Sequence, residues 1–176
     1  NLQSATLIAS ELEREILPTR IAEYKPADLD MLIAAGEVIW VGVERVGERD
    51  GRISLYLADS FPLLYPPIDV AARLATLSDR ARAIYDLLKR EGALFSAAIH
   101  ANSGGGFPGD TTDALWELAW AGLITNDTYH SVRGFLRRND AKRPRGDGDG
   151  KPGSPEFLRR FRSRAKAGGS SIAVSR

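Results

Sequence analysis

The chain has 176 residues, of which 43% are hydrophobic, so it can form one ordinary domain or two very small ones. It contains no cysteine and only two histidines, His100 and His130, which excludes disulfides, thiol catalysis and cysteine-ligated metals and argues against a histidine-rich metal site. No signal peptide opens the sequence, no apolar run approaches the ~20 residues of a membrane span, and Asn1 is no initiator. We therefore expect a cytoplasmic piece of something longer, without a membrane partner.

The net charge of +1 conceals two oppositely charged parts. Residues 133–176 hold 13 Lys and Arg against 4 Asp and Glu, a net charge of +9. Residues 1–132 hold the remaining 11 basic and 19 acidic side chains, a net charge of −8. A basic stretch behind an acidic body suggests a polyanion partner, although a solvated linker would have the same composition.

A pair of helices is predicted near the start of the chain. The segment Ser10–Glu13 has the form of a capping box, and Pro18 ends or kinks the helix that follows it. Pro26 suits the first position of a second helix, which Gly36 ends. Residues 1–9, ahead of this pair, are expected to be disordered or a linker.

A β-hairpin is predicted directly after the second helix. Residues 37–46 are rich in branched and aromatic side chains, and apolar and polar side chains alternate over residues 53–57. The turn between them ends in Asp50-Gly51. Helix, turn, helix and hairpin in this order predict a winged helix over residues 10–58.

Residues 59–78 contain three prolines and are predicted to be a linker. A helix then begins at Ser78-Asp79 and ends at Gly92, and a short helix covers residues 96–101. The next helix follows a glycine loop, with Asp110 as its expected cap.

An internal repeat connects the two regions. Residues 29–38 align without gaps on residues 115–124 in the pattern Leu-x-x-Leu-x-x-Ala-Gly-x-[Val/Ile]. Any amphipathic helix that ends in glycine resembles this pattern, but the gapless match favours a second winged-helix unit over residues 79–136. The predicted fold class is α+β, mainly α, with tandem winged-helix units. Residues 137–176 are predicted to be a basic, Gly-rich and largely flexible tail, with a short basic helix from Ser154 to about Gly168.

The sequence offers binding residues rather than catalytic ones. It has no phosphate-binding loop or calcium loop, so we expect no catalytic residue, metal ligand or cofactor in this chain. A winged helix contacts nucleic acid with its second helix and its wing, and basic stretches neutralise phosphates. The candidate nucleic-acid contacts are Lys25, Arg45, Arg49, Arg52, Thr111, Thr112, Asn126, Thr128, Arg133, Arg137, Arg138, Lys142, Arg143 and Arg145.

Two alternatives remain open. Winged helices also serve as protein-packing modules, for which Trp116, Trp120 and residues 61–64 would supply apolar contacts. Such a module would dock onto other domains of the same protein or onto a second copy of this chain, giving a homo-oligomer. A base-excision role for carboxylates such as Asp113 or Asp127 is the weaker alternative.

Several motifs resemble one family. Residues 114–128, Leu-Trp-Glu-Leu-Ala-Trp-Ala-Gly-Leu-Ile-Thr-Asn-Asp-Thr after Ala114, are similar to a signature of the bacterial large helicase-related (Lhr) proteins. Leu17-Pro18-Thr19-Arg20, Tyr24, Leu29-Asp30, the run from Gly36 to Gly42, Asp50-Gly51-Arg52 and the run from Glu91 to Phe95 resemble the same family. The resemblance covers about residues 10–136 and fades from Asn139 onward.

The resemblance implies a segment of a superfamily 2, ATP-dependent, 3′-to-5′ DNA translocase linked to DNA repair. ATP and magnesium would bind the RecA-like motor domains, none of which lies in this chain. Long members add tandem winged helices and a β-barrel that resemble DNA glycosylases. We therefore expect a nucleoid-associated segment that binds single-stranded or duplex DNA, or has an architectural role, with no ATPase site of its own.

Overall fold

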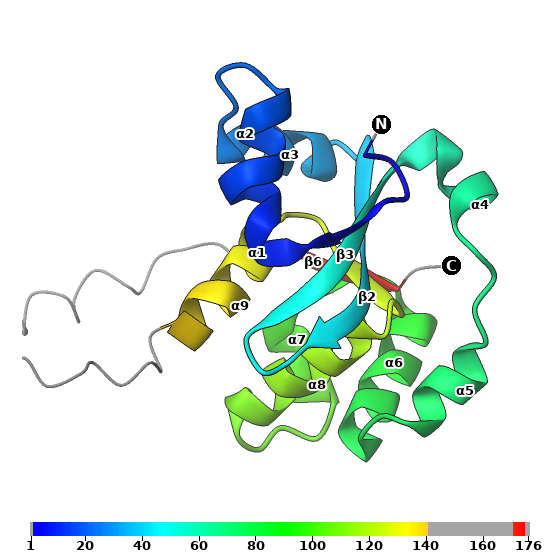
Figure 1. The fold of residues 1–176 in the computed structure, drawn as a ribbon. Helices are drawn as coiled ribbons and strands as arrows, with labels where there is room; N and C mark the ends of the chain where they lie inside the picture. The colour runs from blue at the N-terminus through cyan, green and yellow to red at the C-terminus, as the bar shows by residue number, and fades with distance from the viewer. Residues whose placement is uncertain (1, 141–170, 175–176) are drawn as a thin grey trace, which may run out of the picture.

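The computed structural model describes residues 2–140 and 171–174. In this part of the chain, two three-stranded antiparallel sheets lie among short helices. Figure 1 shows helices α2 and α3 at one end of the molecule, α6 to α8 at the other, and the β2–β3 hairpin between them. No helix among these residues is long and apolar enough to cross a membrane.

The first unit contains one more strand than the sequence predicted. Its elements are β1 (Thr6–Ile8), α1 (Ala9–Glu11), η1 (Leu12–Ile16, a π-helix), α2 (Leu17–Arg20), α3 (Pro26–Ala34), β2 (Val38–Val46) and β3 (Asp50–Leu57). Strand β1 pairs with β3, with Thr6 opposite Ser54, so the expectation that residues 1–9 are disordered or a linker was wrong for residues 6–8. A strand of three residues is too short to show alternation in the sequence, and only its partner defines it.

The predicted capping box at Ser10 was also wrong. The helix begins at Ala9, and the Ser10 hydroxyl donates to Asp50 Oδ2 at 2.5 Å. Pro18 does not end the helix, because η1 directly precedes it and the chain stays helical to Arg20. A π-helical turn is wider than an α-helical turn, and it leaves room for a ring that cannot donate a backbone hydrogen bond.

Residues 59–78 form a structured strap rather than an open linker. They contain the end of η2 (Ala58–Ser60), then α4 (Phe61–Leu64) and α5 (Val70–Ala75). The Tyr65 ring stacks on Phe61 at a centroid distance of 4.8 Å, and its hydroxyl donates to the carbonyl of Gly122 at 3.1 Å. Burial raises the pKa of Tyr65 above its ordinary value. The strap therefore reaches from the first unit to the second, because Tyr65 and Arg73 both donate to backbone carbonyls of the second unit.

The second unit begins where the sequence predicted and ends much later. Its elements are α6 (Asp79–Glu91), β4 (Leu94–Phe95), α7 (Ser96–Asn102), α8 (Pro108–Trp120), β5 (Ile124–Asn126), α9 (His130–Asp140) and β6 (Ser171–Val174). Ser78 caps α6, accepting from the Ala81 N–H at 3.2 Å. Asp110 lies in the first turn of α8 but is not its cap, since that helix begins at Pro108.

The two units share one topology. The sheet orders are β1-β3-β2 and β4-β6-β5, so in each unit the last strand lies between the first and the second. Val38 of β2 faces Leu57, and its counterpart in the repeat, Ile124 of β5, faces Val174. In both units the repeat covers the end of the second helix and the first residue of the next strand. The prediction of tandem winged helices is therefore confirmed.

Strand β6 shows that part of the C-terminal region belongs to the second unit. Because β6 pairs with both β4 and β5, residues 171–174 belong to the second unit, and residues 127–170 connect its second and third strands. The predicted end of this unit at residue 136 and the assignment of all of 137–176 to a tail were wrong in this respect. Helix α9 was not predicted, and the expected basic helix from residue 154 lies outside the described residues.

Candidate nucleic-acid interface

The second helix of the second unit packs on the hairpin of the first. A Cβ atom added to Gly42 of β2 would overlap the carbonyl of Ala119, and one added to Gly51 of β3 would overlap the Trp120 ring. Glycine at both positions lets the hairpin lie directly on the end of α8. This end of α8 is therefore inside the molecule and is not available to enter a groove of nucleic acid.

An aromatic cluster packs α9 on α8 within the second unit. The rings of Trp116 and Trp120 stack with centroids 5.4 Å apart, and Phe135 of α9 lies 4.5 Å and 5.3 Å from them. The tryptophans were candidates for docking onto a partner protein. In the described part of the chain they pack against this chain's own elements.

Arg133 joins the two units. Its Nη1 donates to Asp30 Oδ2 at 2.6 Å, and its Nε and Nη2 donate to the two carboxylate oxygens of Glu13 at 2.5 and 2.8 Å. Its side chain is 16% exposed, and its guanidinium lies 5.5 Å from the Tyr129 ring centroid. Burial lowers the pKa of Arg133, but the bonds to Glu13 and Asp30 outweigh burial and raise it above the ordinary value. This predicted phosphate contact instead has a structural role, because both its charge and its donors are satisfied internally.

Two other candidates are buried. Thr111 accepts from Arg80 Nη2 at 2.8 Å and contacts His100 Nδ1 at 2.8 Å. Asn126 accepts at its backbone carbonyl from Trp40 Nε1 at 3.1 Å, which links β5 to β2. Both predicted contacts are therefore corrected to structural positions, since a buried side chain cannot reach a phosphate.

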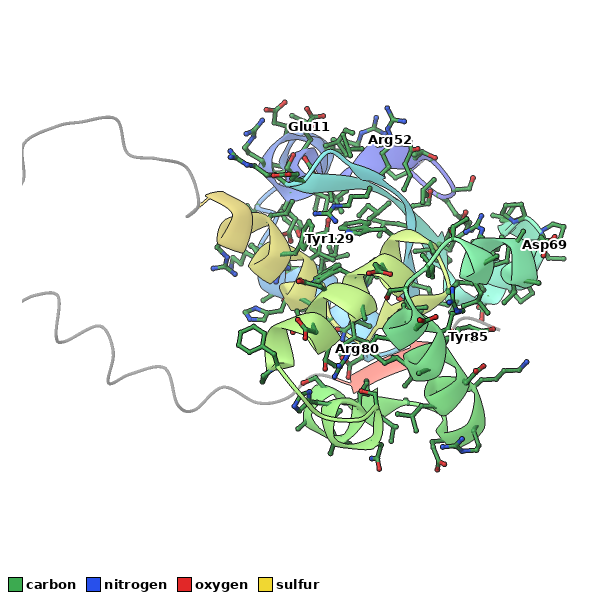
Figure 2. All side chains as sticks on the ribbon, turned by 90° about the horizontal axis from the view of Figure 1, so that it is seen from below. Glu11, Arg52, Asp69, Arg80, Tyr85 and Tyr129 are labelled. Carbon is green, nitrogen blue, oxygen red and sulfur yellow. The ribbon has the colours of Figure 1, made fainter. Side chains whose placement is uncertain are left out.

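Two threonine candidates are half-buried and locally bonded. The Thr112 hydroxyl donates to the carbonyl of Pro108 at 3.1 Å, and Thr128 donates from its backbone N–H to Asn126 Oδ1 at 2.9 Å. Figure 2 shows Tyr129, the next residue, inside the molecule, whereas Arg52 lies toward its periphery.

The hairpin of the first unit exposes its arginines without gathering them on one face. The predicted wing contacts are Arg45, Arg49 and Arg52, all exposed. Glu44 faces Arg52 across the strands and forms an ion pair with it, whereas Arg45 faces Gly51. Neighbouring residues of a strand point to opposite faces, so Arg45 and Arg52 lie on opposite sides of the hairpin. The arginines of this hairpin therefore attract the phosphates of a nucleic acid only weakly.

The second helix of each helix-turn-helix pair carries acidic charge. Lys25 is exposed at the start of α3, but α3 itself contains Asp28 and Asp30 and no Lys or Arg. Helix α8 likewise contains no Lys or Arg, and its charged residues are Asp110, Asp113 and Glu117. Carboxylates repel the phosphates that line a nucleic-acid groove, so neither helix is suited to groove insertion.

The basic residues collect instead between β5 and β6. Residues 127–170 contain 12 Lys and Arg against 5 Asp and Glu. Arg137 is exposed on α9, where its Nε donates to the carbonyl of Arg133 at 3.2 Å. The Arg138 side chain and the residues Lys142, Arg143 and Arg145 lie outside the described part. From the sequence alone this stretch is predicted to be a tail, because the run Ser171–Val174 is too short to predict a third strand.

Acidic side chains do not form a metal site in the described part of the chain. No group of three or more His, Asp or Glu side chains there could hold a metal ion. Asp113 is exposed on α8, and Asp127 is half-buried after β5. These two carboxylates therefore lie on different elements.

Two units of one topology, each with a helix-turn-helix and a third strand inserted in its sheet, define a tandem winged-helix protein. A family model for the winged-helix domain of large helicase-related proteins matches residues 1–58. The chain is 37% identical over 136 residues to an "Lhr helicase/ probable uracil glycosylase" of Mycolicibacterium smegmatis, and 34% identical over 148 residues to an "Lhr helicase/uracil glycosylase" of Escherichia coli. The chain thus belongs to the large helicase-related (Lhr) family. These matches cover 77% and 81% of this chain but only 9% of each relative.

Proposed function

We propose that this chain is a nucleic-acid-binding and architectural segment of an Lhr-type, ATP-dependent DNA helicase that acts in DNA repair. ATP and magnesium would be used by domains outside this chain. The observation that carries the proposal is the position of the basic stretch. It lies between the second and third strands of the second unit, where a winged helix has its wing.

The charge distribution supports contact with the phosphate backbone rather than with bases. The stretch from Arg137 to Lys166 provides guanidinium and ammonium groups, whereas α3 and α8 provide carboxylates. Lysine and arginine on phosphates position a protein without reading sequence. We therefore expect binding to single-stranded or duplex DNA with little sequence preference and strong salt dependence.

A titration at several salt concentrations tests this proposal. The logarithm of the association constant should fall with the logarithm of salt concentration, with a slope of about −0.7 to −0.9 for each phosphate neutralised. Replacing Lys142, Arg143 and Arg145 together by serine should make that slope shallower by about two to three units. The matched control replaces Arg45, Arg49 and Arg52, which should change the slope little. Absence of binding at low salt, or equal effects of the two triple variants, would overturn the proposal.

A second candidate function is protein docking, favoured by the acidic charge of α3 and α8. Exposed apolar side chains on the strap, such as Leu63 and Leu64, would contribute to such a contact. Sedimentation over a range of protein concentrations separates the two functions. A monomer at every concentration would count against docking between copies.

The names of both relatives also include a uracil glycosylase. We assign no base-excision step to this chain, because Asp113 lies on α8 whereas Asp127 follows β5, so the two candidate carboxylates stand on different elements. Prolonged incubation with a uracil-containing duplex checks this assignment. Release of the base would contradict it and would make Asp113 and Asp127 the first residues to substitute.

A further inference from the structure

The turn between α7 and α8 presents an aromatic side chain to solvent. Phe107, the residue directly before α8, is 71% exposed. Its ring lies against the backbone of Gly109, since a Cβ atom added to Gly109 would overlap the ring. The three residues before it, Gly104-Gly105-Gly106, have positive φ angles and no side chains. The ring is therefore supported by the backbone on one side, and the glycines that flank it have no side chains to cover it.

Hydrogen bonds hold this turn in place. Arg80 of α6 donates from Nη2 to the carbonyl of Gly105 and to the hydroxyl of Thr111, the latter at 2.8 Å. His100 of α7 contacts the same hydroxyl through Nδ1 at 2.8 Å, and its carbonyl accepts from the Gly105 N–H at 3.0 Å. Because three helices fix the turn, the exposure of Phe107 is a property of the fold, and a fixed loop is where proteins place binding residues.

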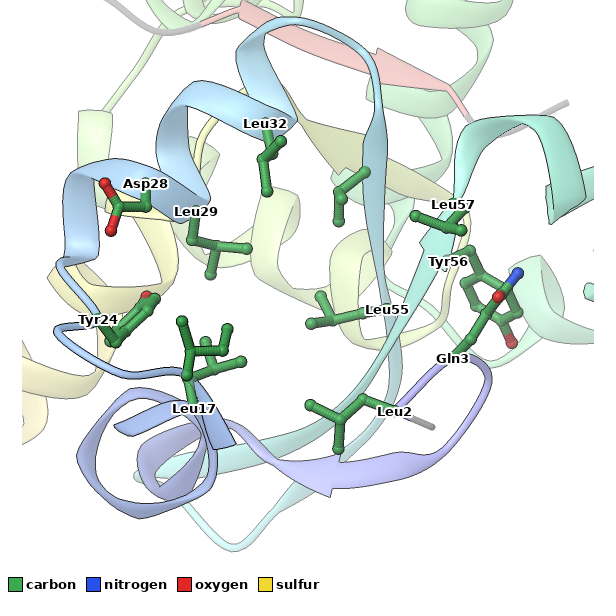
Figure 3. A pocket seen from close by; sticks show the side chains of 12 residues that line it. Leu2, Gln3, Leu17, Tyr24, Asp28, Leu29, Leu32, Leu55, Tyr56 and Leu57 are labelled. Atoms are coloured by element: carbon green, nitrogen blue, oxygen red, sulfur yellow. The ribbon is translucent and has the colours of Figure 1, made fainter. Parts of the chain in front are cut away.

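The corresponding turn of the first unit uses its aromatic side chain internally. Tyr24 shortly precedes α3 and is half-buried, and its hydroxyl donates to Glu13 Oε1 at 2.5 Å. Figure 3 shows Tyr24 among the side chains that line an apolar groove of the first unit. Phe107 has no hydroxyl and cannot make such a bond. The second turn, unlike the first, therefore presents its aromatic ring to a ligand.

The charges near Phe107 decide which part of a nucleic acid fits this turn. Asp110 and Asp113 are exposed near the beginning of α8. Their carboxylates repel phosphates but accept hydrogen bonds from the amino groups of bases. An aromatic ring stacks on any base that is not already paired within a duplex. The beginning of α8 is thus suited to a base and unsuited to the sugar-phosphate backbone.

Building on the proposed function, we propose that Phe107 stacks on an unpaired base of a DNA strand whose phosphates the basic stretch contacts. Figure 1 shows the beginning of α8 and the end of α9 on the same side of the molecule, and the basic stretch continues from α9. The opposite end of α8 packs on the hairpin of the first unit, so a strand has access to this helix at its beginning. Single-stranded DNA is therefore the preferred substrate.

Titrations of the 176-residue chain with single-stranded DNA and with a fully paired duplex of the same length test the proposal. Phe107→Ala should weaken binding of the single strand about 5- to 150-fold and leave binding of the duplex unchanged. The slope of binding against salt concentration should stay the same, because stacking releases no counterion. The matched control is Leu63→Ala, which removes an 87% exposed apolar side chain from the strap and should change neither affinity.

Phe107→Trp provides a second readout that keeps the stacking surface. Binding of the single strand should be retained, and the fluorescence of the added indole should be quenched when a base lies on it. The parent chain, with its three tryptophans, gives the background signal. Unchanged affinity of Phe107→Ala for the single strand, an equal loss for both DNAs, or binding without quenching by Phe107→Trp would overturn this proposal and leave the proposed function standing. Absence of DNA binding by the parent chain would overturn both.

Discussion

Arg133 connects α9 to the first unit at the level of single atoms. Its guanidinium donates to the carboxylates of Glu13 and Asp30 and to the carbonyl of Pro26. Both carboxylates are largely buried with it. Removing the cation would leave two carboxylates in a place where water solvates them poorly.

Arg133→Gln should therefore lower the free energy of unfolding by about 3–5 kcal/mol, the cost of breaking a buried ion pair from one side. Urea denaturation at neutral pH measures this change. The control is Arg137→Gln, which alters an exposed arginine of the same helix and should stay within about 0.5 kcal/mol of the parent. Similar, small effects of both substitutions would show that the contact between the units does not depend on Arg133.

A pH prediction concerns Tyr129. Burial, followed by the nearby Glu13 carboxylate, raises the pKa of Tyr129 well above its ordinary value of 10. Above about pH 10 the unfolded chain therefore loses this proton while the folded chain keeps it, and stability must fall as pH rises. Below pH 10 both states hold the proton, and Tyr129 causes no slope.

Tyr129→Phe should make the alkaline decline less steep, although it also removes the hydrogen bond from the hydroxyl to the Ala9 carbonyl. The loss of that bond should lower stability by about 1 kcal/mol at every pH. Urea denaturation of both proteins below and above pH 10 measures the two effects. Parallel pH curves would contradict the prediction.

At the scale of elements, the contact between β2 and α8 depends on Gly42, the position at which β2 has no side chain. Gly42 brings the backbone of β2 against the carbonyl of Ala119, and this contact holds the hairpin on the second unit. The C-terminal end of α8 is thereby used for packing.

Gly42→Ala should destabilise the protein by about 1–3 kcal/mol, because the added methyl group forces two backbones apart. Gly134 of α9 is the matched control: a Cβ atom there meets nothing within 4 Å. Gly134→Ala should stabilise the protein by up to about 1 kcal/mol through its higher helix propensity. Melting temperatures should move in opposite directions, and a shift of the same sign in both would contradict this account.

Which elements could be predicted depended on their length and local signals. Helices α3 and α6 carry proline, serine or glycine at their ends and a regular apolar face, and both were predicted closely. Strands β1 and β6 are three and four residues long, and they are strands only because distant partners pair with them. Helix α9 was missed because a basic, glycine-rich composition begins within it.

At the scale of the whole molecule, the two winged helices share one core. A single cluster of buried side chains includes Leu12, Leu29 and Trp40 from the first unit and Leu118 and Tyr129 from the second. The strap from residue 59 to residue 78 adds hydrogen bonds to Gly122 and Ala121 across the units. The units should therefore not unfold independently.

We expect one cooperative unfolding transition. Tryptophan fluorescence, which reports on Trp40, Trp116 and Trp120 near the contact between the units, should follow the same curve as far-UV circular dichroism, which reports on the helices of both. Two separate transitions would show that the contact is weaker than the core within each unit. Gly42→Ala is the variant in which such a separation is expected first.

The residues of the candidate site also divide into those that the sequence could predict and those that it could not. The exposed wing arginines and the basic stretch could be located from the sequence, because charge and turn residues are local properties. The burial of Thr111 and Asn126 and the internal pairing of Arg133 could not be predicted. Each depends on a residue from a distant part of the chain, such as Arg80 or Glu13.

By itself, the sequence determined the two helix-turn-helix units, their repeat and the strong separation of acidic from basic residues, since periodicity and composition act over a few neighbouring residues. Only the tertiary structure decided that the basic stretch connects two strands and that the end of α8 faces the first unit. These features arise from packing and pairing between residues up to 120 positions apart, and such contacts leave no local pattern in the sequence.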